Sequence, residues 1–539
     1  MEPVRLGTAP ARWILLATVL GSSVAALDAT VVNVALPRLA RDLDADVAGL
    51  QWTVNAYTLT LAGFILLGGS LGDRFGRRRV FVVGVVWFAL ASLLCGAAQN
   101  IGTLVAARAL QGVGGALLTP GSLAIIQASF APGDRPRAVG AWSGLGGVAG
   151  AVGPLAGGWL VEAGWRWVFL LNLPLSAVVV LVALRHVPET SDPRAQGRFD
   201  VLGAVLAALA LAGTTYAFTE APGSAASTGA VGLAAALGLA AAAGFVLVER
   251  ARGRGRSLLP ARRRDGPPRP MLPLDVFASR QFSAVNVVTF VVYGGMSVMF
   301  FLFVVNLQVV SGFSAVAAGT ALLPVTVLML LLSSRAGALA QRIGPRLPMT
   351  AGLVVAAAGM LLVGRVGAGT SYLGGVLPAV LVFGLGLSAV VAPLTATVLA
   401  TADERHAGVA SGVNNAVARA AGLLAVAAIP PLAGLTGDAF ADPAVFSAGF
   451  RVAMPVCAAL LAAGAVLSLF TVRDDALRTA PEEREPCCRV HCAVGAPPLE
   501  PEPPTGSEAP SGSGPRSGAG SSSEPAPEQG TGRGPGAAG

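Results

Sequence analysis

Two ionisable side chains of opposite charge lie deep within apolar stretches of this sequence. Asp28 stands in the stretch 13–35, and Arg108 stands in the stretch 101–127. At a helical rise of about 1.5 Å per residue, they lie about 13 Å and about 10 Å from the same edge of the apolar layer. We therefore expect the two charges at similar depth, where they can pair directly or through water.

An ionisable group at such depth costs at least about 2.5 kcal/mol and usually faces a cavity or a partner. Burial favours the neutral carboxyl of Asp28, whereas the nearby guanidinium of Arg108 favours the carboxylate. A carboxylate balanced between these two effects can exchange a proton when a cavity opens or closes. We expect Asp28 and Arg108 to couple proton movement to a conformational change. A purely structural ion pair is the alternative.

Other polar residues share these two stretches. Thr30 and Asn33 follow Asp28, and Gln111 follows Arg108 by three residues, which places it on the same helix face one turn along. We expect Thr30, Asn33 and Gln111 to line a substrate path. The hydroxyl of Thr30 could instead bond its own backbone.

A second arginine lies near the middle of an apolar stretch. Arg419 is about 18 Å, by helix rise, from the nearer end of the stretch 407–433. At that depth it could meet an anionic substrate or a carbonyl oxygen. We include it in the expected substrate path.

These residues stand in a chain whose composition is typical of a membrane protein. Of its 539 residues, 54% are hydrophobic and 12% are charged, whereas a soluble domain is about 25% charged. Apolar runs long enough to span a bilayer recur along most of the length, which predicts an all-α polytopic membrane protein. We predict fourteen transmembrane helices, at 13–35, 50–71, 80–99, 101–127, 137–161, 167–186, 201–219, 229–248, 282–310, 315–339, 347–366, 372–400, 407–433 and 449–472.

The distribution of arginine tests this count. The chain has 37 arginines and no lysine. If the N-terminus is inside, 26 arginines fall on the cytoplasmic side, counting Arg473 and Arg478 directly after the last span. Five fall outside, at Arg38, Arg41, Arg166, Arg365 and Arg451. This split follows the positive-inside rule. It predicts a multi-pass protein of the cytoplasmic membrane with both termini cytoplasmic.

The loop 68–80, GGSLGDRFGRRRV, places an acid among arginines between two apolar stretches. Its glycines allow close backbone approach, and the acid can pair with an arginine or cap a helix. An ordinary positive-inside loop would need neither feature. We expect a conformational gate formed by Gly72, Asp73, Arg74, Gly76, Arg77 and Arg78. A weaker copy, AGALAQRIGPRLP, occurs at 336–348, with Gln341 in place of the acid.

The stretch 137–161 carries glycines at intervals of three and four residues. Such spacing forms a stripe down one helix face and permits very close helix packing. Pro154 interrupts the hydrogen-bond ladder of this stretch, which predicts a kink. The residues of interest are Gly150, Gly153, Pro154, Gly157 and Gly158.

Together these motifs resemble the drug:proton antiporter-2 family, the fourteen-spanning multidrug efflux branch of the major facilitator superfamily. The segments that carry the resemblance are LDATVVNVALPRL (27–39), the loop 68–80, RALQGVGGALLTPGS (108–122), the Gly153-Pro154 motif, GWRWVFLLNLPL (164–175) and LQVVSGFSAVAAGTALLP (307–324). The glycine-proline motif resembles one found in antiporters of this superfamily and generally absent from its symporters. Three residues, Ala149, Leu175 and Gln341, and the segment 411–424 depart from the family pattern.

The resemblance implies a proton-driven antiporter that exports small amphiphilic drugs or antibiotics by alternating access. It implies a major facilitator fold of two six-helix halves plus two extra central helices. No cofactor is expected, because the proton gradient drives transport. The expected partners are a small-molecule substrate, protons and membrane lipid, with no nucleic acid, and the protein is expected to be a monomer.

The expected organisation follows the spans and the composition. It comprises a cytoplasmic N-terminus (1–12), an N-terminal half (13–200), two inserted helices (201–248), a basic cytoplasmic linker (249–280), a C-terminal half (281–472) and a disordered cytoplasmic tail (473–539). The tail is rich in Pro, Gly, Ser and Glu and nearly lacks apolar clusters. Its Cys487, Cys488, His491 and Cys492 fit no standard zinc spacing, so no metal site is predicted.

Other functions remain open at this stage. The protein could export one native metabolite, such as a self-made antibiotic, rather than many drugs. An importer is a further alternative, against which the glycine-proline motif argues. An enzyme is not expected, because the apolar stretches hold no histidine or cysteine cluster, no paired acids and no nucleophile motif.

Overall fold

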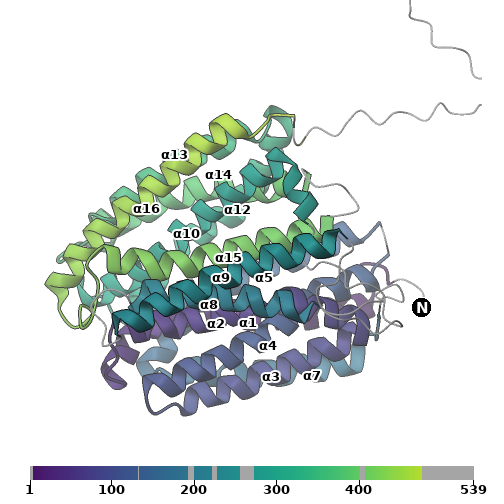
Figure 1. Ribbon diagram of the computed structural model, residues 1–539, viewed down its shortest axis with the longest axis horizontal. Helices are drawn as coiled ribbons and strands as arrows, with labels where there is room; N and C mark the ends of the chain where they lie inside the picture. The colour runs from purple at the N-terminus through teal and green to yellow at the C-terminus, as the bar shows by residue number, and fades with distance from the viewer. Residues whose placement is uncertain are drawn as a thin grey trace, which may run out of the picture. The chain divides into compact units, whose positions relative to one another are not determined.

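The protein, seen here in a computed structural model, is built of helices (Figure 1). The structure describes residues 4–131, 133–191, 200–220, 227–254, 272, 274–400, 407–475 and 477. Within these ranges there is no strand, and a single bridge joins the extended residues Val4 and Phe130. The cysteines and histidine of the tail lie outside the described residues, as does most of the basic linker.

The helices follow the predicted order. The first group is α1 (Ala9–Asp42), α2 (Val47–Phe75), α3 (Arg77–Ala97), α4 (Ile101–Ser129), α5 (Arg135–Ala163), α6 (Arg166–Leu170) and α7 (Asn172–His186). Two helices follow, α8 (Val201–Glu220) and α9 (Thr228–Gly253). The last group is η1 (Leu274–Ala278), α10 (Arg280–Val309), α11 (Ala315–Thr320), α12 (Leu323–Ile343), α13 (Arg346–Val363), η2 (Tyr372–Val376), α14 (Leu377–Ala400), α15 (Ala407–Leu432) and α16 (Pro443–Thr471).

The predicted spans all fall on helices. Within the described residues, twelve helices are long and apolar enough to cross a membrane, and α2, which bends by 49° after Ile65, makes a thirteenth. The remaining predicted span lies on α5, a helix of 29 residues. The predicted all-α membrane architecture is therefore confirmed.

Capping residues explain where several helices begin. Helix α1 starts four residues before the predicted span, because the Thr8 side chain accepts a hydrogen bond from the backbone of Ala11. Helix α4 starts at the predicted residue, where Asn100 and Thr103 form a reciprocal capping box. Helix α16 starts earlier than predicted, because Asp442 caps its first turn. Hydropathy alone does not report these polar signals.

The same five helix pairings occur at both ends of the chain. In the first group, α2 and α3 each pack on α4, while α1 packs on α5 and α7, and α3 packs on α7. In the last group, α12 and α13 each pack on α14, α10 packs on α15 and α16, and α13 packs on α16. Figure 1 shows α3, α4 and α7 on one side of the molecule and α13, α14 and α16 on the other. The weak sequence repeat thus has a counterpart in the packing.

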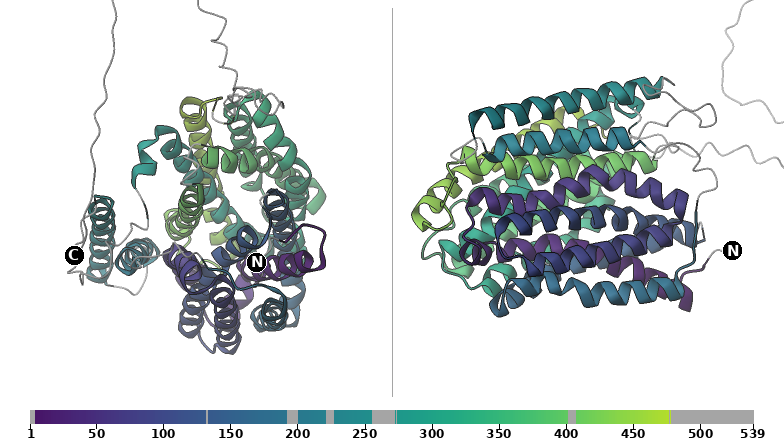
Figure 2. Two further views of the ribbon diagram at one scale, coloured as in Figure 1. Left: turned by 90° about the vertical axis from the view of Figure 1, so that its right-hand side faces the viewer. Right: turned by 60° about the horizontal axis from the view of Figure 1, so that its bottom comes forward.

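The inserted helices lie against both groups. Helix α8 packs on α2 and on α15, and α9 packs on α8, as the views in Figure 2 show. The indole nitrogen of Trp52 in α2 donates a hydrogen bond to the Glu220 carboxylate, 3.0 Å away, at the end of α8. The insert therefore covers the boundary between the two groups on one side.

Glycines set the close approach of paired helices. A Cβ atom at Gly68 in α2 would clash with the carbonyl of Ala116 in α4. In the pairing of α13 with α14, a Cβ atom at Gly359 would lie 2.6 Å from the Cα atom of Phe383. Because the obstructing atoms are backbone, they cannot rotate away as a side chain would. Small residues at these crossings therefore fix how closely the helices pack.

We predict that Gly359→Ala destabilises the protein. The added methyl group forces α13 and α14 apart, and overpacking of this kind costs about 1–3 kcal/mol. The temperature of thermal unfolding of the purified protein in detergent should fall. Gly232→Ala in α9 is the control, because nothing lies within 4 Å of a Cβ atom at that position. Equal unfolding temperatures for the two variants would contradict the prediction.

Candidate functional site

The carboxylate of Asp28 is buried among three side-chain donors. Asp28 is 1% exposed. Its Oδ2 atom accepts a hydrogen bond from Arg108, with which it forms an ion pair. Its Oδ1 atom accepts hydrogen bonds from Gln111 Nε2 at 2.8 Å and from Asn172 Nδ2 at 3.0 Å. The direct pairing allowed by the depth estimate is therefore present, and helices α1, α4 and α7 meet at this carboxylate.

The guanidinium of Arg108 is held from several sides. Its Nε atom donates to the backbone oxygen of Thr53 at 3.0 Å, and its NH1 atom also donates to Gln111 Oε1 at 2.6 Å. The guanidinium carbon lies 4.4 Å from the ring centroid of Tyr57 and 5.9 Å from that of Phe169. Such cation–π contacts stabilise a cation that has left water. Arg108 therefore has hydrogen-bond acceptors and aromatic rings around it in addition to Asp28.

A serine ties the donors of Asp28 together. Ser92 Oγ accepts hydrogen bonds from Gln111 Nε2 at 3.1 Å and from Asn172 Nδ2 at 2.9 Å. The Ser92 hydroxyl itself donates to the backbone oxygen of Phe169 at 2.9 Å. Ser92, Asn172 and Tyr57 were not predicted from the sequence. Asn172 lies within the motif 164–175, but its spacing along the chain does not relate it to Asp28.

A central cavity of about 360 Å³ lies between α1 and α2 on one side and α10 and α15 on the other. Thr30, Asn33 and Arg419 line it, so three of the four residues of the expected substrate path are brought together. Gln111 is not among the lining residues and instead belongs to the Asp28 network. Thr30 also donates to the backbone oxygens of its own helix, as its alternative interpretation supposed.

The loop between α2 and α3 forms the expected acid–arginine contact within itself. Arg77 Nε lies 2.9 Å from Asp73 Oδ1, one helical turn away. Gly76 ends α2 with φ at +109°, which favours glycine. The loop is also held by Glu189, which the sequence analysis missed. Glu189 accepts a hydrogen bond from the backbone nitrogen of Arg78 at 3.1 Å, and its Oε2 lies 3.6 Å from Nε of Arg78 and of Arg79.

The loop between α12 and α13, which contains the weaker copy of the motif, is built in the same way. Gly344 ends α12 with φ at +92°. A Cβ atom there would lie 2.5 Å from a carboxylate oxygen of Asp474, just as one at Gly76 would lie 2.5 Å from a carboxylate oxygen of Glu189. Each acid follows the last helix of its group. The two loops therefore correspond in structure, although Gln341 replaces the acid at the position of Asp73.

The glycine-proline motif packs α5 against two other helices. A Cβ atom at Gly153 would clash with the hydroxyl of Thr30 in α1, and one at Gly157 would lie 2.8 Å from Val31. One at Gly158 would lie 2.6 Å from the Cα atom of Val316 in α11. A Cβ atom at Gly319, also in α11, would in turn clash with the carbonyl of Pro154. The motif thus forms a close contact between the two groups of helices, while the packing around Gly150 lies outside the described residues.

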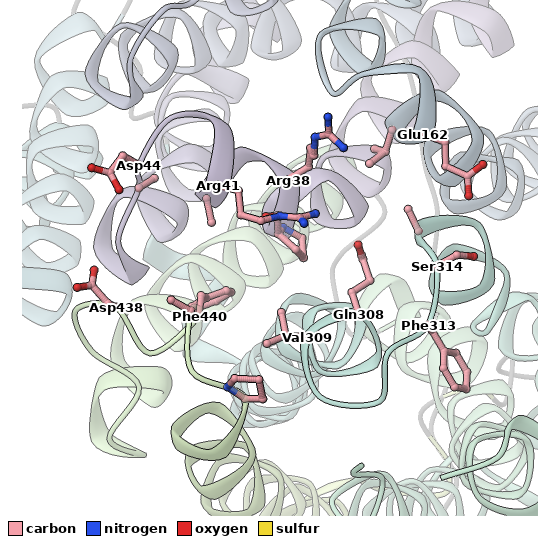
Figure 3. Close-up of a pocket in the computed structure, with 17 residues that line it drawn as sticks. Arg38, Arg41, Asp44, Glu162, Gln308, Val309, Phe313, Ser314, Asp438 and Phe440 are labelled. Carbon is pink, nitrogen blue, oxygen red and sulfur yellow. The ribbon is translucent and has the colours of Figure 1, made fainter. Parts of the chain in front are cut away.

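A larger pocket of about 910 Å³ lies at the end of the helices opposite the Asp73 loop. Figure 3 shows Arg38 and Arg41 of α1 between acids that come from different elements. Asp44 and Asp438 lie on one side, and Glu162 at the end of α5 lies on the other. The pocket is therefore a charged vestibule bordered by both groups of helices.

Comparisons with known proteins agree with these features. The family model described as Major Facilitator Superfamily matches residues 18–426. The puromycin resistance protein pur8 of Streptomyces alboniger is 36% identical over 477 residues, which are 86% of this chain and 92% of that protein. The multidrug resistance protein Stp of Mycobacterium tuberculosis is 34% identical over 417 residues, which are 75% of this chain and 72% of that protein.

Solved structures show the same fold. The POT family transporter PepTSo superposes with a TM-score of 0.60 at 15% sequence identity, covering 85% of this chain and 96% of that one. At this identity the likeness concerns the arrangement of helices alone.

We predict that Asn172→Ala destabilises the first group of helices. The change removes the hydrogen bonds that Asn172 donates to the Asp28 carboxylate and to the Ser92 hydroxyl. A buried charged group that loses one donor costs about 1–3 kcal/mol. Thermal unfolding in detergent measures the loss. Ser176→Ala on the same helix is the control, because its buried hydroxyl has no partner within the described residues. An Asn172→Ala protein as stable as this control would show that the contact contributes nothing.

Proposed function

Because the chain belongs to the major facilitator superfamily, we propose that it is a proton-driven antiporter that exports small amphiphilic drugs or antibiotics across the cytoplasmic membrane. The names of the two relatives, a puromycin resistance protein and a multidrug resistance protein, support export of such compounds. No group of metal-ligating side chains is found within the described ranges.

One observation carries the proposal: a buried acid–arginine network lies beside a cavity that both groups of helices line. Asp28 is on the same helix as Thr30 and Asn33, which face the cavity, and Arg108 is bonded to Thr53 next to the cavity residues Val54 and Asn55. A movement that opens the cavity therefore moves the helices that hold the ion pair. This connection supports coupling between proton uptake and substrate binding.

In the mechanism we propose, the end with the Asp73 loop faces the cytoplasm. Open to the outside, the protein releases substrate and the Asp28 carboxylate takes a proton. It then rocks inward, and the proton leaves as substrate enters the cavity from the cytoplasm or the inner leaflet. Exchange requires that the proton and the substrate disfavour each other's occupancy, whether directly or through the conformational change.

The contacts at the vestibule end are those that outward opening would break. Gln308 Nε2 in α10 donates to the backbone oxygen of Val34 in α1 at 3.0 Å. Gln51 Nε2 in α2 donates to the backbone oxygen of Val426 in α15 at 2.7 Å. With the close approach of Gly158 to α11, these contacts form a seam across both groups. In our proposal the seam closes the outer side and limits proton leak while the substrate is loaded.

Export of a single native compound is the second candidate. It is favoured by the relative whose name refers to one antibiotic, puromycin. Extrusion measured across a panel of unrelated compounds separates the two candidates. Extrusion of many compounds indicates multidrug export, and extrusion of one compound with its close analogues indicates a dedicated exporter.

We predict that Asp28→Asn abolishes proton-coupled export. Asparagine keeps an oxygen acceptor for Arg108 but has no proton to exchange at this site. In inverted vesicles made acidic inside, adding substrate should release lumenal protons with the natural protein, and the signal of the variant should equal that of empty vesicles. Asp28→Glu, which keeps a titratable group, should restore part of the signal. Full proton release by a folded Asp28→Asn protein would exclude the coupling role.

We predict that Asp73→Asn slows turnover several-fold while leaving the substrate concentration at half-maximal rate nearly unchanged. The side chains of Arg77 and Asp73 are 19% and 39% exposed, and a solvent-accessible ion pair of this kind contributes at most about 1 kcal/mol to stability. Its effect should therefore appear in the rate of conformational exchange. Asp42→Asn, which breaks the exposed i,i+4 pair of Arg38 and Asp42 at the other end, is the matched control. A change confined to apparent affinity would contradict the gating role.

A further inference from the structure

We propose that the central cavity binds its substrate through an anionic group and that Arg419 binds that group. The substrate class is an amphiphilic organic anion, with an aromatic body and a carboxylate or another ionised oxygen. This inference rests on the proposed export function, because it names the chemistry of the molecule that occupies the transport cavity.

The first observation is that Arg419 is a cation without a counter-charge. It lies in α15, within the apolar layer, and lines the central cavity. Its Nε atom is buried and has no hydrogen-bond partner, and no ion pair of Arg419 is found among the described residues. Tyr293 lines the same cavity, and no acidic side chain does so among the described lining residues. A guanidinium in an apolar layer without an acceptor is unfavourable, so a bound anion would stabilise it.

The contrast with Arg108 shows what the missing partner would supply. Arg108 has a carboxylate, a backbone oxygen, an amide oxygen and two aromatic rings around it. In the part of the chain that the structure describes, no ion pair of Arg419 is found, and its Nε atom has no hydrogen-bond partner. The buried Arg108 and the half-buried Arg419 thus differ in their counter-charge. One is already neutralised by the protein, and the other is available to a ligand.

The remaining cavity wall favours the same sign of charge. No aspartate or glutamate is among the described residues that line the cavity, so the charge of its wall is positive. The amide nitrogen of Asn55, a second donor on this wall, is buried and has no partner within the described residues. A carboxylate can accept hydrogen bonds from a guanidinium and an amide together, and such charge-assisted bonds are roughly twice as strong as neutral ones.

Aromatic side chains supply a place for the body of the ligand. Tyr293, Phe300 and Phe301 of α10 line the cavity across from α1 and α2. The cavity volume of about 360 Å³ lies at the lower end of the range typical of small-molecule sites. One or two fused ring systems with a single charged group match this volume and wall.

Tyr57 connects the cavity to the proton site. It lies on α2 next to Thr58, which lines the cavity, and its ring lies on the guanidinium of Arg108. No direct contact joins Arg419 to Asp28 within the described residues. An anion at Arg419 would attract a proton to Asp28 rather than repel it, so exchange of the two must come from the conformational change.

The test compares two dyes that share a xanthene ring system and differ in charge. Fluorescein is an anion at neutral pH, and rhodamine 123 is a cation. Binding of each dye to the purified full-length protein in lipid nanodiscs is measured by fluorescence anisotropy. We expect the natural protein to bind fluorescein more tightly than rhodamine 123, with affinity for fluorescein that weakens as the salt concentration rises.

The variants assign the preference to one side chain. Arg419→Gln should weaken fluorescein binding by about 10- to 100-fold, the loss expected for a hydrogen bond to a charged group, and should leave rhodamine 123 binding unchanged or tighter. Arg419→Lys should keep most of the preference for the anion. Arg365→Gln is the control, because it removes the same charge from an exposed residue outside the cavity.

Four outcomes would overturn the inference. Two concern the natural protein: equal or tighter binding of rhodamine 123, and binding of neither dye. Two concern Arg419→Gln: a folded variant that binds fluorescein as the natural protein does, and an equal loss of both dyes, which would indicate a structural role. Proton release in vesicles is measured separately, so failure of Asp28 coupling with an intact dye preference would overturn antiport and leave the anion site standing.

Discussion

The buried pair of Asp28 and Arg108 is the constraint on which the first half of the molecule depends. Removing one partner of a buried pair leaves an uncompensated charge and costs about 3–5 kcal/mol. Helices α1, α4 and α7 must therefore stay in one register, with Asn172 from α7 and Gln111 from α4 completing the shell around the carboxylate. The backbone oxygen of Thr53 adds α2 to the same arrangement. The site at which we propose proton exchange thus also fixes how four helices pack.

Close helix packing is the second constraint, and the two halves satisfy it in the same way. The five pairings of the first group recur in the last group, and glycines permit backbone contact in both. The loops at Gly76 and Gly344 each receive an acid from the chain segment after the last helix of their group. The halves differ at one position that matters, since Asp73 has its counterpart in Gln341. The gate that we propose is therefore asymmetric, with its acid–arginine contact in the first half.

The sequence predicted those features that follow from local periodicity and burial. Fourteen apolar stretches gave the helices, and depth along two of them placed Asp28 opposite Arg108. Contacts between distant segments could not be predicted in this way, because no spacing rule relates Asn172 or Ser92 to Asp28, or Glu189 to the Asp73 loop. Gln111 shows the limit most clearly: its helix face was predicted, yet only the crossing of α4 with α1 decides that this face meets the carboxylate rather than the cavity.

The sign of the charge in the central cavity decides which force drives exchange. Export of a cation for one proton moves no net charge, so the pH gradient alone would drive it. Export of a monoanion for one proton moves two elementary charges inward, worth about 4.6 kcal/mol per 100 mV of membrane potential. A cavity whose free cation is Arg419 would therefore draw on the membrane potential, and Asp28 would supply the proton step. Within this scheme, Arg108 stabilises the proton site, and Arg419 selects the molecule to be moved.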